Sequence, residues 1–381
     1  METIEVLFYL LLTLIVYPYF IYPLAIYSIT KLYSKDLDMD SNVPFVTLMI
    51  SAYNEERIIE KKILNSLDLS YPKNRIQILV ISDLSTDETN NIVRSYENLG
   101  VDLYVSSERQ GKTAGLNQAI KLAKGEIVVF SDADAMYSSD SVTRMVNILS
   151  DKNIGLVTGS TDYVVDGYEN MVATSSMYTQ LERFLKRMES KIGSCVGADG
   201  AIFALRKSLF SPLNEDDIND LVIPLKVVHK GYRVIYDDQV RCFEPPSVDA
   251  AVEFKRQVRI TNRTLWALYR NAHLMNVFKY PLFAFEMISH KLLRFTVPIF
   301  MIFLLLINIL ISSESELYYI LLICQIGFYA LGAVGYLFEK IAGKQSKLSI
   351  ITHFILVQLS ILLGWIGFIS GKKQVIWKPR N

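Results

Sequence analysis

The sequence predicts an α/β domain with a mostly parallel sheet, flanked by transmembrane helices at both ends. Long uncharged apolar stretches gather near the two ends of the 381-residue chain, and short β-rich runs alternate with helical patterns over residues 44–270. Only 20% of the residues are charged, below the roughly 25% that is typical of soluble domains. Alternating strands and helices favour a parallel sheet that binds ligands at the carboxyl ends of its strands.

Four stretches without a charged residue are each long enough to cross about 30 Å of hydrocarbon. They are Val6–Thr30, Phe295–Ser313, Leu317–Phe338 and Leu348–Gly371. The first follows Glu2 and Glu5 rather than a basic segment, and it is too long for the core of a signal peptide. We therefore expect residues 1–35 to form a retained anchor and residues 294–371 to hold the other transmembrane helices.

Basic residues give the expected orientation, because cytoplasmic loops are enriched in Lys and Arg. Lys31 and Lys35 follow the first span, which predicts a multi-pass protein of the cell membrane with its α/β domain in the cytoplasm. Four crossings would leave the C-terminus outside, yet the tail over 372–381 is basic and favours the inside. Either one candidate span is re-entrant or the rule fails for this chain.

Residues 276–293 mix aromatic and aliphatic side chains with charged ones. This composition is typical of an amphipathic helix that lies in the membrane interface and contacts membrane lipids. A helix of the soluble core is the alternative.

The α/β domain is expected to contain four strands, at Val46–Ser51, Ile76–Ile81, Val101–Val105 and Glu126–Phe130. The helical patterns that follow them cover Glu55–Ser66, Thr86–Leu99, Gly111–Ala123 and Ser139–Leu149. The polar residues directly after each strand are therefore the first candidates for a binding site.

Charge and cysteine content exclude two function classes. The 39 basic and 39 acidic side chains give a net charge of +0, so no overall field favours nucleic acid. The 3 cysteines have no CxxC spacing, which argues against a zinc site or a disulfide framework.

The first two strands end in polar clusters. Residues 51–56 read Ser-Ala-Tyr-Asn-Glu-Glu, and either they face a ligand or Asn54 simply caps the next helix. Asp83 stands at the tip of the second strand, where its carboxylate could accept a hydrogen bond from a base or a ribose. Farther on, Gly111 lies between cations, Arg109 and Lys112, and could approach phosphates closely, although the spacing is not that of a Walker loop.

The most specific pattern is the apolar strand that ends in Ser131-Asp132-Ala133-Asp134. Two carboxylates placed so close together repel each other unless a cation binds them. A hard divalent cation that bridges substrate phosphates fits this DxD pattern, and Mg²⁺ or Mn²⁺ would then assist the leaving group. The alternative is that both carboxylates cap the next helix.

Two charged clusters follow. Residues 215–221 are rich in acids and open a helix that closes at Gly231, and a carboxylate there could be a general base. The run Lys255-Arg256-Gln257-Val258-Arg259 could bind a diphosphate or anionic headgroups.

The order of these motifs resembles that of membrane-bound family-2 glycosyltransferases with a GT-A fold, such as poly-N-acetylglucosamine, cellulose and hyaluronan synthases. The match spans nearly the whole chain and includes the segments at 46–56, 82–87, 109–112, 131–134, 197–200, 219–220 and 256–259. The combination is far more specific than any one segment.

The resemblance implies a role for each matching residue. The nucleotide-sugar would be held by Ala52, Glu55, Asp83, Lys112, Asp132, Arg256, Gln257 and Arg259. Asp134 would ligate Mg²⁺ or Mn²⁺ together with Asp132. The acceptor pocket would be shaped by Gly197, Ala198, Asp199 and Gly200, and Asp220 would be the general base.

Two positions depart from the family pattern. Asn219 precedes Asp220 where another acid is usual, which leaves Asp217 as the second candidate base. Ile260 stands where polymer synthases usually carry Trp, which puts processivity in doubt.

The function implied is inverting transfer of a sugar from a nucleotide-sugar, expected to be a UDP-sugar, to a saccharide or lipid-linked acceptor. Such a reaction would serve cell-surface polysaccharide or glycolipid synthesis. Two alternatives remain open at this point: a polyprenyl-phosphate monoglycosyltransferase and a non-catalytic membrane scaffold.

Overall fold

A computed structural model of the chain describes residues 2–35, 43–164, 173–174, 177–245, 250–342 and 347–375. The chain divides into two compact units. One unit, here called the helical unit, comprises residues 1–24, 249–268 and 287–373. The other, called the catalytic unit, comprises residues 25–248, 269–286 and 374–381 and holds the sheet.

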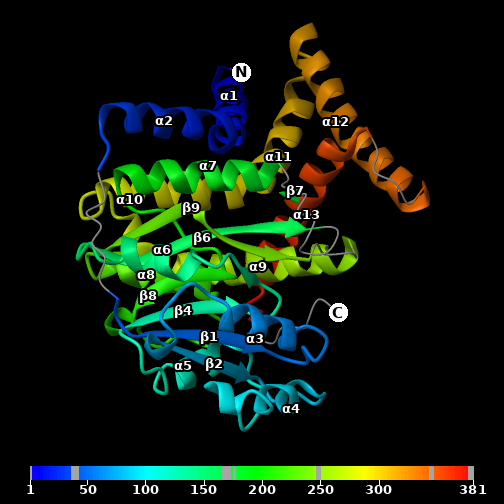
Figure 1. Ribbon diagram of the computed structural model, residues 1–381. Helices are drawn as coiled ribbons and strands as arrows, with labels where there is room; N and C mark the ends of the chain where they lie inside the picture. Colours follow the sequence, from blue (N-terminus) through cyan, green and yellow to red (C-terminus); the bar gives the residue numbers. More distant parts are fainter. Residues whose placement is uncertain are drawn as a thin grey trace. The chain divides into compact units, whose positions relative to one another are not determined.

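The catalytic unit is built on a sheet with the strand order β3-β2-β1-β4-β8-β6-β9-β5, and β7 pairs with β6 (Figure 1). The strands are β1 Val46–Ala52, β2 Ile76–Ser82, β3 Val101–Val105, β4 Ile127–Asp132, β5 Met136–Tyr137, β6 Ile154–Val164, β7 Ala173–Thr174, β8 Ile202–Arg206 and β9 Arg233–Glu244. β1 pairs in parallel with β2 and β4, and β2 pairs in parallel with β3. The mostly parallel α/β sheet expected from the sequence is confirmed, and the four expected strands match to within two residues.

The helices of the catalytic unit pack on both faces of this sheet. They are α3 Ile59–Leu67, α4 Thr89–Arg94, α5 Lys112–Ala119, α6 Ser141–Ile148, α7 Met177–Ile192, α8 Asn219–His229 and α10 Pro281–Glu286. Single turns of 3₁₀ helix lie at Lys73–Arg75, Glu97–Leu99, Lys207–Leu209 and Ala272–Met275. α3 begins at Ile59, after Ile58 and not after Asn54, so the interpretation of Asn54 as a helix cap is wrong.

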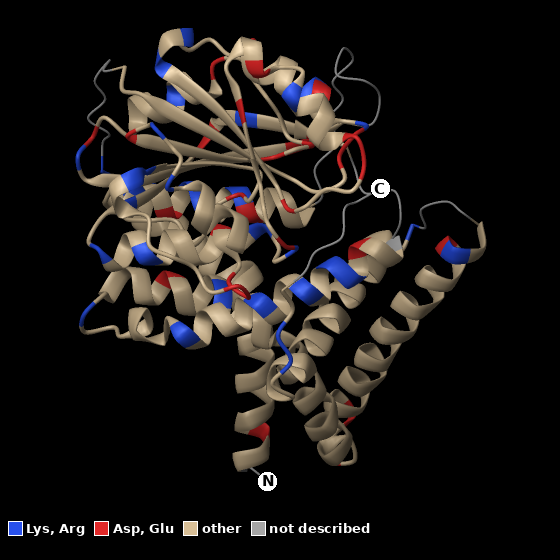
Figure 2. Cartoon of the chain, turned by 90° about the horizontal axis from the view of Figure 1, so that it is seen from below, with Lys and Arg blue, Asp and Glu red and all other residues tan. Residues whose placement is uncertain are grey.

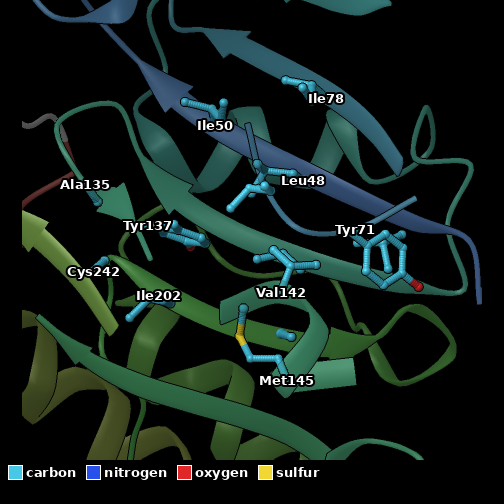
Figure 3. Close-up of a cluster of buried hydrophobic side chains, with 14 of the residues drawn as sticks. Leu48, Ile50, Tyr71, Ile78, Ala135, Tyr137, Val142, Met145, Ile202 and Cys242 are labelled. Carbon is cyan, nitrogen blue, oxygen red and sulfur yellow. The ribbon is translucent and has the colours of Figure 1, made fainter. Parts of the chain in front are cut away.

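Burial of the central strands explains their composition. Every residue of β1 is buried, as expected for a parallel strand covered on both faces. Leu48 and Ile50 project from one face of β1 toward the layer that holds Val142 and Met145 of α6 (Figure 3). This core fixes the strands, so the polar residues at their carboxyl ends hold defined positions.

The helical unit contains the long apolar helices. Its elements are α1 Glu2–Val16, a π-helical turn Tyr17–Ile21, α9 Ala250–Arg270, a second π-helical turn Met287–Leu292, α11 Leu293–Ile311, α12 Glu316–Ala342 and α13 Ser349–Ile369; α2, Tyr22–Leu32, continues from the first turn into the catalytic unit. Within the described residues, four helices are long and apolar enough to cross a membrane: Thr3–Leu32, Pro281–Ile311, Glu316–Ala342 and Ser349–Ile369. Lys, Arg, Asp and Glu are sparse along these long helices (Figure 2).

The segment expected to be a separate amphipathic helix over 276–293 has a different organisation. From Pro281 onward it runs without a break into α11, as one helix that ends at Ile311. Its location in the membrane interface stays a prediction.

α13 packs along two neighbours of the helical unit. Near its start, Thr352 lies against Gly335 of α12, where an added methyl group would come within 2.1 Å of the threonine Oγ1. Near its end, Gly364 lies against Thr261 of α9, where an added methyl group would come within 2.4 Å of the threonine Cγ2. Just past α13, the indole Nε1 of Trp266 on α9 donates to the carbonyl of Lys372 at 3.2 Å.

Candidate active site

The carboxyl ends of β1 and β2 are joined by side-chain hydrogen bonds. Asn54 adopts a left-handed backbone (φ 53°), and its Oδ1 accepts the backbone N–H of Thr86 at 2.8 Å. The backbone N–H of Glu55 donates to Thr89 Oγ1 at 2.8 Å. Ala52 and Glu55 are both buried at this edge. The first two motifs of the sequence therefore form one wall of a single site.

Asp83 fixes the loop that follows β3. Its carboxylate accepts the backbone N–H groups of Gln110 and Gly111, each at 3.1 Å. Gly111 has φ 88°, a conformation that suits glycine. Burial raises the pKa of Asp83, while these N–H groups and Arg109 oppose the change. The guanidinium of Arg109 lies 3.7 Å from the centre of the Tyr53 ring, so the loop closes onto the β1 wall.

Lys112 connects the end of β4 to the loop at 197–200. It is the first residue of α5, and its ammonium group contacts the carboxylate of Asp132 at the end of β4. The same ammonium lies 3.5 Å from the carbonyl oxygen of Gly200. The predicted residues Lys112, Asp132 and Gly200 are therefore together in the folded chain.

Three carboxylates form a possible metal centre. Asp132, Asp134 and Glu244 each place an oxygen within 4.8 Å of the others. Glu244 is the last residue of β9, and this strand pairs with β5, which begins two residues after Asp134. Three hard oxygen donors suit Mg²⁺ or Mn²⁺. The acids predicted from the sequence thus fit the expected ion, and the structure adds Glu244 to them.

Sequence reasoning missed Glu244 because the pairing of its strand, β9, with β5 and β6 is long-range. The only local signal was a carboxylate directly before Pro245.

A buried cation lies behind the three carboxylates. Lys62 of α3 is 0% exposed, donates to the carbonyl of Ala135, and sits 4.0 Å from the centre of the Tyr137 ring. Burial lowers the pKa of Lys62 to about 7, while Cys242, Asp134, Asp132 and Glu244 oppose the change. The sequence does not single out this lysine, because it falls within an ordinary helical pattern.

The loop at 197–200 wraps around the first turn of α8. The N–H of Ala198 donates to the carbonyl of Asp220 at 2.6 Å. A methyl group added at Gly200 would stand 3.0 Å from Asp220 Oδ2, so the glycine leaves room for this carboxylate. Gly197 has φ 90°, which favours glycine at the turn. The residues assigned to the acceptor pocket therefore surround the residue assigned as the base.

Asp199 stabilises this loop. Its carboxylate accepts from the backbone N–H of Thr161 at 3.1 Å, from the hydroxyl of Thr161 at 2.8 Å and from the N–H of Ala201 at 3.1 Å. These bonds fasten the acceptor loop to β6.

The second candidate base has a different environment. Asp217 and the adjacent Asp216 form ion pairs with Arg270. Asp217 is 2% exposed and also accepts from the N–H and the side-chain amide of Asn214. This pairing explains the acidic run before α8 as a structural cluster and favours Asp220 as the base.

The cationic run lies on α9 of the helical unit. Arg256 contacts Glu253 at 3.2 Å, and Gln257 donates to the same carboxylate at 2.7 Å. Burial, together with Arg263 and Arg256, lowers the pKa of Arg259 to about 10. Binding of the diphosphate by Arg256, Gln257 and Arg259 stays a prediction.

Comparison with known proteins identifies the domain that carries this site. A family model described as Glycosyl transferase family 2 matches residues 47–213. The chain contains a family-2 glycosyltransferase domain. The matched range includes Ala52, Glu55, Asp83, both aspartates of the DxD motif and the loop at 197–200.

Two curated relatives are synthases. A beta-monoglucosyldiacylglycerol synthase of Nostoc sp. is 32% identical over 137 residues, which are 35% of this chain and 29% of that protein. A poly-beta-1,6-N-acetyl-D-glucosamine synthase of Staphylococcus aureus is 27% identical over 223 residues, which are 57% of this chain and 53% of that protein. The chain thus spans from under a third to about half the length of these relatives.

One solved structure matches almost the whole chain. It is a mannosyltransferase from Pyrobaculum calidifontis in complex with GDP-Man and Mn²⁺, with a TM-score of 0.73 and 22% identity. The match covers 97% of this chain and 100% of the other. The GT-A fold that the sequence resemblance implied is therefore confirmed.

Proposed function

We propose that the chain is an inverting, metal-dependent glycosyltransferase that moves a sugar from a nucleotide-sugar to a saccharide or lipid-linked acceptor. One observation carries the proposal. Lys112 joins Asp132 of the carboxylate cluster to Gly200, and Gly200 makes room for the Asp220 carboxylate. A diphosphate-binding group and a candidate base therefore lie on the two sides of one short loop.

The donor would bind along the carboxyl ends of β1 to β4. Ala52, Glu55 and Asp83 line the nucleotide wall, and Lys112 lies where it can neutralise a phosphate oxygen. A divalent ion bound by the three carboxylates would supply Lewis-acid stabilisation of the leaving diphosphate. The Mn²⁺ in the mannosyltransferase complex supports this assignment of the cluster.

The acceptor chemistry is assigned to Asp220. Its carboxylate takes the proton from an acceptor hydroxyl, and the hydroxyl oxygen forms a bond to the anomeric carbon of the sugar. The bond from that carbon to the diphosphate oxygen breaks, and the nucleoside diphosphate leaves with the electron pair. One displacement inverts the configuration at the anomeric carbon.

The four long apolar helices support a location in the cell membrane, with the catalytic unit on the cytoplasmic side, where basic residues follow the first helix. A lipid-linked acceptor would suit this location. The diacylglycerol-linked product named for the Nostoc sp. relative supports the same class. A polyprenyl phosphate is a narrower member of that class.

The first experiment is a scan of UDP- and GDP-sugars with the purified full chain and Mn²⁺, with diphosphate release as the readout. We expect release with one donor, and its loss when EDTA removes the metal. Mass spectrometry of the extracted product then separates a polymer from a monoglycosyl lipid, including a glycosylated polyprenyl phosphate.

Replacement of the base is the sharpest single test. The Asp220→Asn protein should bind the nucleotide with affinity like that of the original chain, while its kcat falls by about 100-fold or more, because general base catalysis is lost. Binding is measured by calorimetry and turnover by product formation.

Asp238→Asn is the matched control, because Asp238 is half-exposed and forms an ion pair with Arg187, which belongs neither to the loop at 197–200 nor to the carboxylate cluster. It should retain the original turnover. Near-normal turnover of Asp220→Asn would overturn the assignment. A non-catalytic scaffold predicts instead that the original chain releases no diphosphate with any donor and that Asp132, Asp134 and Asp220 are dispensable for its role in the cell.

A further inference from the structure

One face of α7 holds the chain segment that leads into the acceptor loop. The carboxylate of Glu189 accepts the backbone N–H of Val196 at 3.1 Å. The hydroxyl of Ser190 accepts the N–H of Tyr236 on β9 at 2.8 Å. Both side chains are buried, so α7 holds the segment before the loop at 197–200 and the neighbouring strand β9.

Lys186 extends this face to the acceptor loop. Its side chain is 9% exposed, and its ammonium group donates to the carbonyl of Ala198 at 3.0 Å. The N–H of the same residue, Ala198, donates to the carbonyl of Asp220. Ala198 is therefore held by the lysine through its carbonyl and by the candidate base through its N–H.

The groups around this ammonium are mostly acidic. Glu182, one helical turn earlier, lies 4.0 Å away. Burial alone would lower the pKa of Lys186, but the surrounding acids raise it above its ordinary value, so the lysine stays charged. The groups that interact with it are Glu182 on α7, Cys195 and Asp199 in the loop segment, Asp220 on α8 and Tyr236 on β9.

We propose that Lys186 is a positioning residue that aligns the acceptor loop with Asp220 and keeps this carboxylate ionised for proton abstraction. The inference rests on the proposed function, because it assigns the base role to Asp220. A buried positive charge close to a carboxylate favours its charged form. Without the lysine, Asp220 would keep its proton up to a higher pH. It could then act as a base only over a narrower pH range.

The test is the pH profile of kcat/KM for the full chain and its Lys186→Met variant in detergent. The acidic limb of the variant should move up by about one pH unit, because loss of a nearby positive charge disfavours the ionised form of the carboxyl group. Near the foot of that limb the rate should fall about tenfold. Affinity for the nucleoside diphosphate with Mn²⁺ should stay within about twofold, because Lys186 touches no donor-binding residue.

Lys191→Met is the matched control, on the same helix with an exposed side chain. It should keep the original profile. A folded Lys186→Met protein with an unmoved acidic limb overturns the proposal.

Glu182→Gln provides a second variant that does not depend on the folding of Lys186→Met. Removal of this negative charge leaves the positive charge of Lys186 with a stronger effect on the Asp220 carboxylate, so the acidic limb should move to lower pH. A move to higher pH, or none, contradicts the proposal.

A double-mutant cycle tests the same pair without activity. The unfolding midpoints of Lys186→Met, Asp220→Asn and the double variant should be non-additive, because loss of one charge removes the partner's stabilisation. Additive shifts overturn the coupling. If the original chain transfers no sugar while the cycle shows coupling, the proposed function fails and the pairing of the two charges stands.

Discussion

Three carboxylates and one lysine form an unusual charge arrangement at the end of β4. Asp132, Asp134 and Glu244 lie within 4.8 Å of one another, and Lys62 is fully buried behind them. Close carboxylates disfavour each other's ionisation, and a buried ammonium offsets part of that cost. The carbonyl of Ala135 ties the lysine to the turn that carries Asp134, so the charges and the backbone are fixed together.

Glu244 should contribute to metal affinity. Glu244→Gln keeps the shape of the side chain but removes one negative charge from the cluster, so Mn²⁺ affinity should fall by at least about tenfold. Calorimetric titration of the purified chain with Mn²⁺ measures the change. Glu97→Gln, at an exposed site, is the control. Equal Mn²⁺ affinities of the original chain and Glu244→Gln would show that Glu244 is not a ligand.

Lys62 should make stability depend on pH. Its pKa in the folded chain is about 7, below the ordinary 10.5, so between these values the unfolded chain binds more protons than the folded one. Stability due to Lys62 therefore rises with pH in this window, by at most about 1.4 kcal/mol per pH unit. We expect the unfolding midpoint of Lys62→Met to exceed that of the original chain. This difference should shrink from pH 7 to pH 10, measured in metal-free buffer.

The exposed neighbour Lys61 supplies the control for this measurement. The difference in midpoint between Lys61→Met and the original chain should stay constant over the same window. A constant difference for Lys62→Met as well would contradict the buried, weakly basic state of Lys62.

At the scale of elements, the acceptor loop depends on a glycine that makes room for a neighbouring side chain. Gly200 has an ordinary backbone, so alanine meets only the Asp220 carboxylate, 3.0 Å from its methyl group. Gly200→Ala should lower kcat by about tenfold, since small displacements of a catalytic group are costly. Its unfolding midpoint should change little.

Gly100→Ala is the opposite case and the control. Gly100 has φ 84° with open space around it, so alanine is strained but touches nothing. This variant should lose about 1 kcal/mol of stability and keep its turnover. If Gly200→Ala loses stability instead of turnover, the loop has a structural role only.

The strand ends were the part of the site that the sequence could predict. Apolar runs that end in Asp83 and Asp132 mark the carboxyl ends of two strands. Parallel pairing then brings those ends to the same edge of the sheet. Glu244 and Lys62 could not be found this way, because their neighbours come from the β5–β9 ladder and from helix packing. The acidic run before α8 looked functional, but its pairing with Arg270 is visible only in three dimensions.

At the scale of the whole molecule, α13 bears on how many times the chain crosses the membrane. α9 is flanked in the sequence by segments of the catalytic unit. The end of α13 packs against α9 through Gly364 and Lys372. Its start packs near Gly335, about 10 Å from the end of α12 at 1.5 Å per residue. Both ends of α13 therefore have packing partners within the helical unit.

The basic tail predicts that α13 does not make a fourth crossing, because four crossings would leave the tail outside. In a Cys324→Ser background, Gln374→Cys should react with an impermeant thiol reagent only after the cells are opened. Ser313→Cys, between α11 and α12, should react in intact cells. Labelling of Gln374→Cys in intact cells would mean that α13 crosses the membrane.

The segment that follows α13 also determines where a purification tag can be placed. The carbonyl of Val375 lies 3.1 Å from the position that a methyl group on Gly111 would occupy, so the described end of the chain rests on the loop anchored by Asp83. A label attached at Val375 would lie close to the nucleotide wall and compete for space with the donor. Material for donor-binding assays is therefore better tagged at the N-terminus, with the C-terminal end left as encoded.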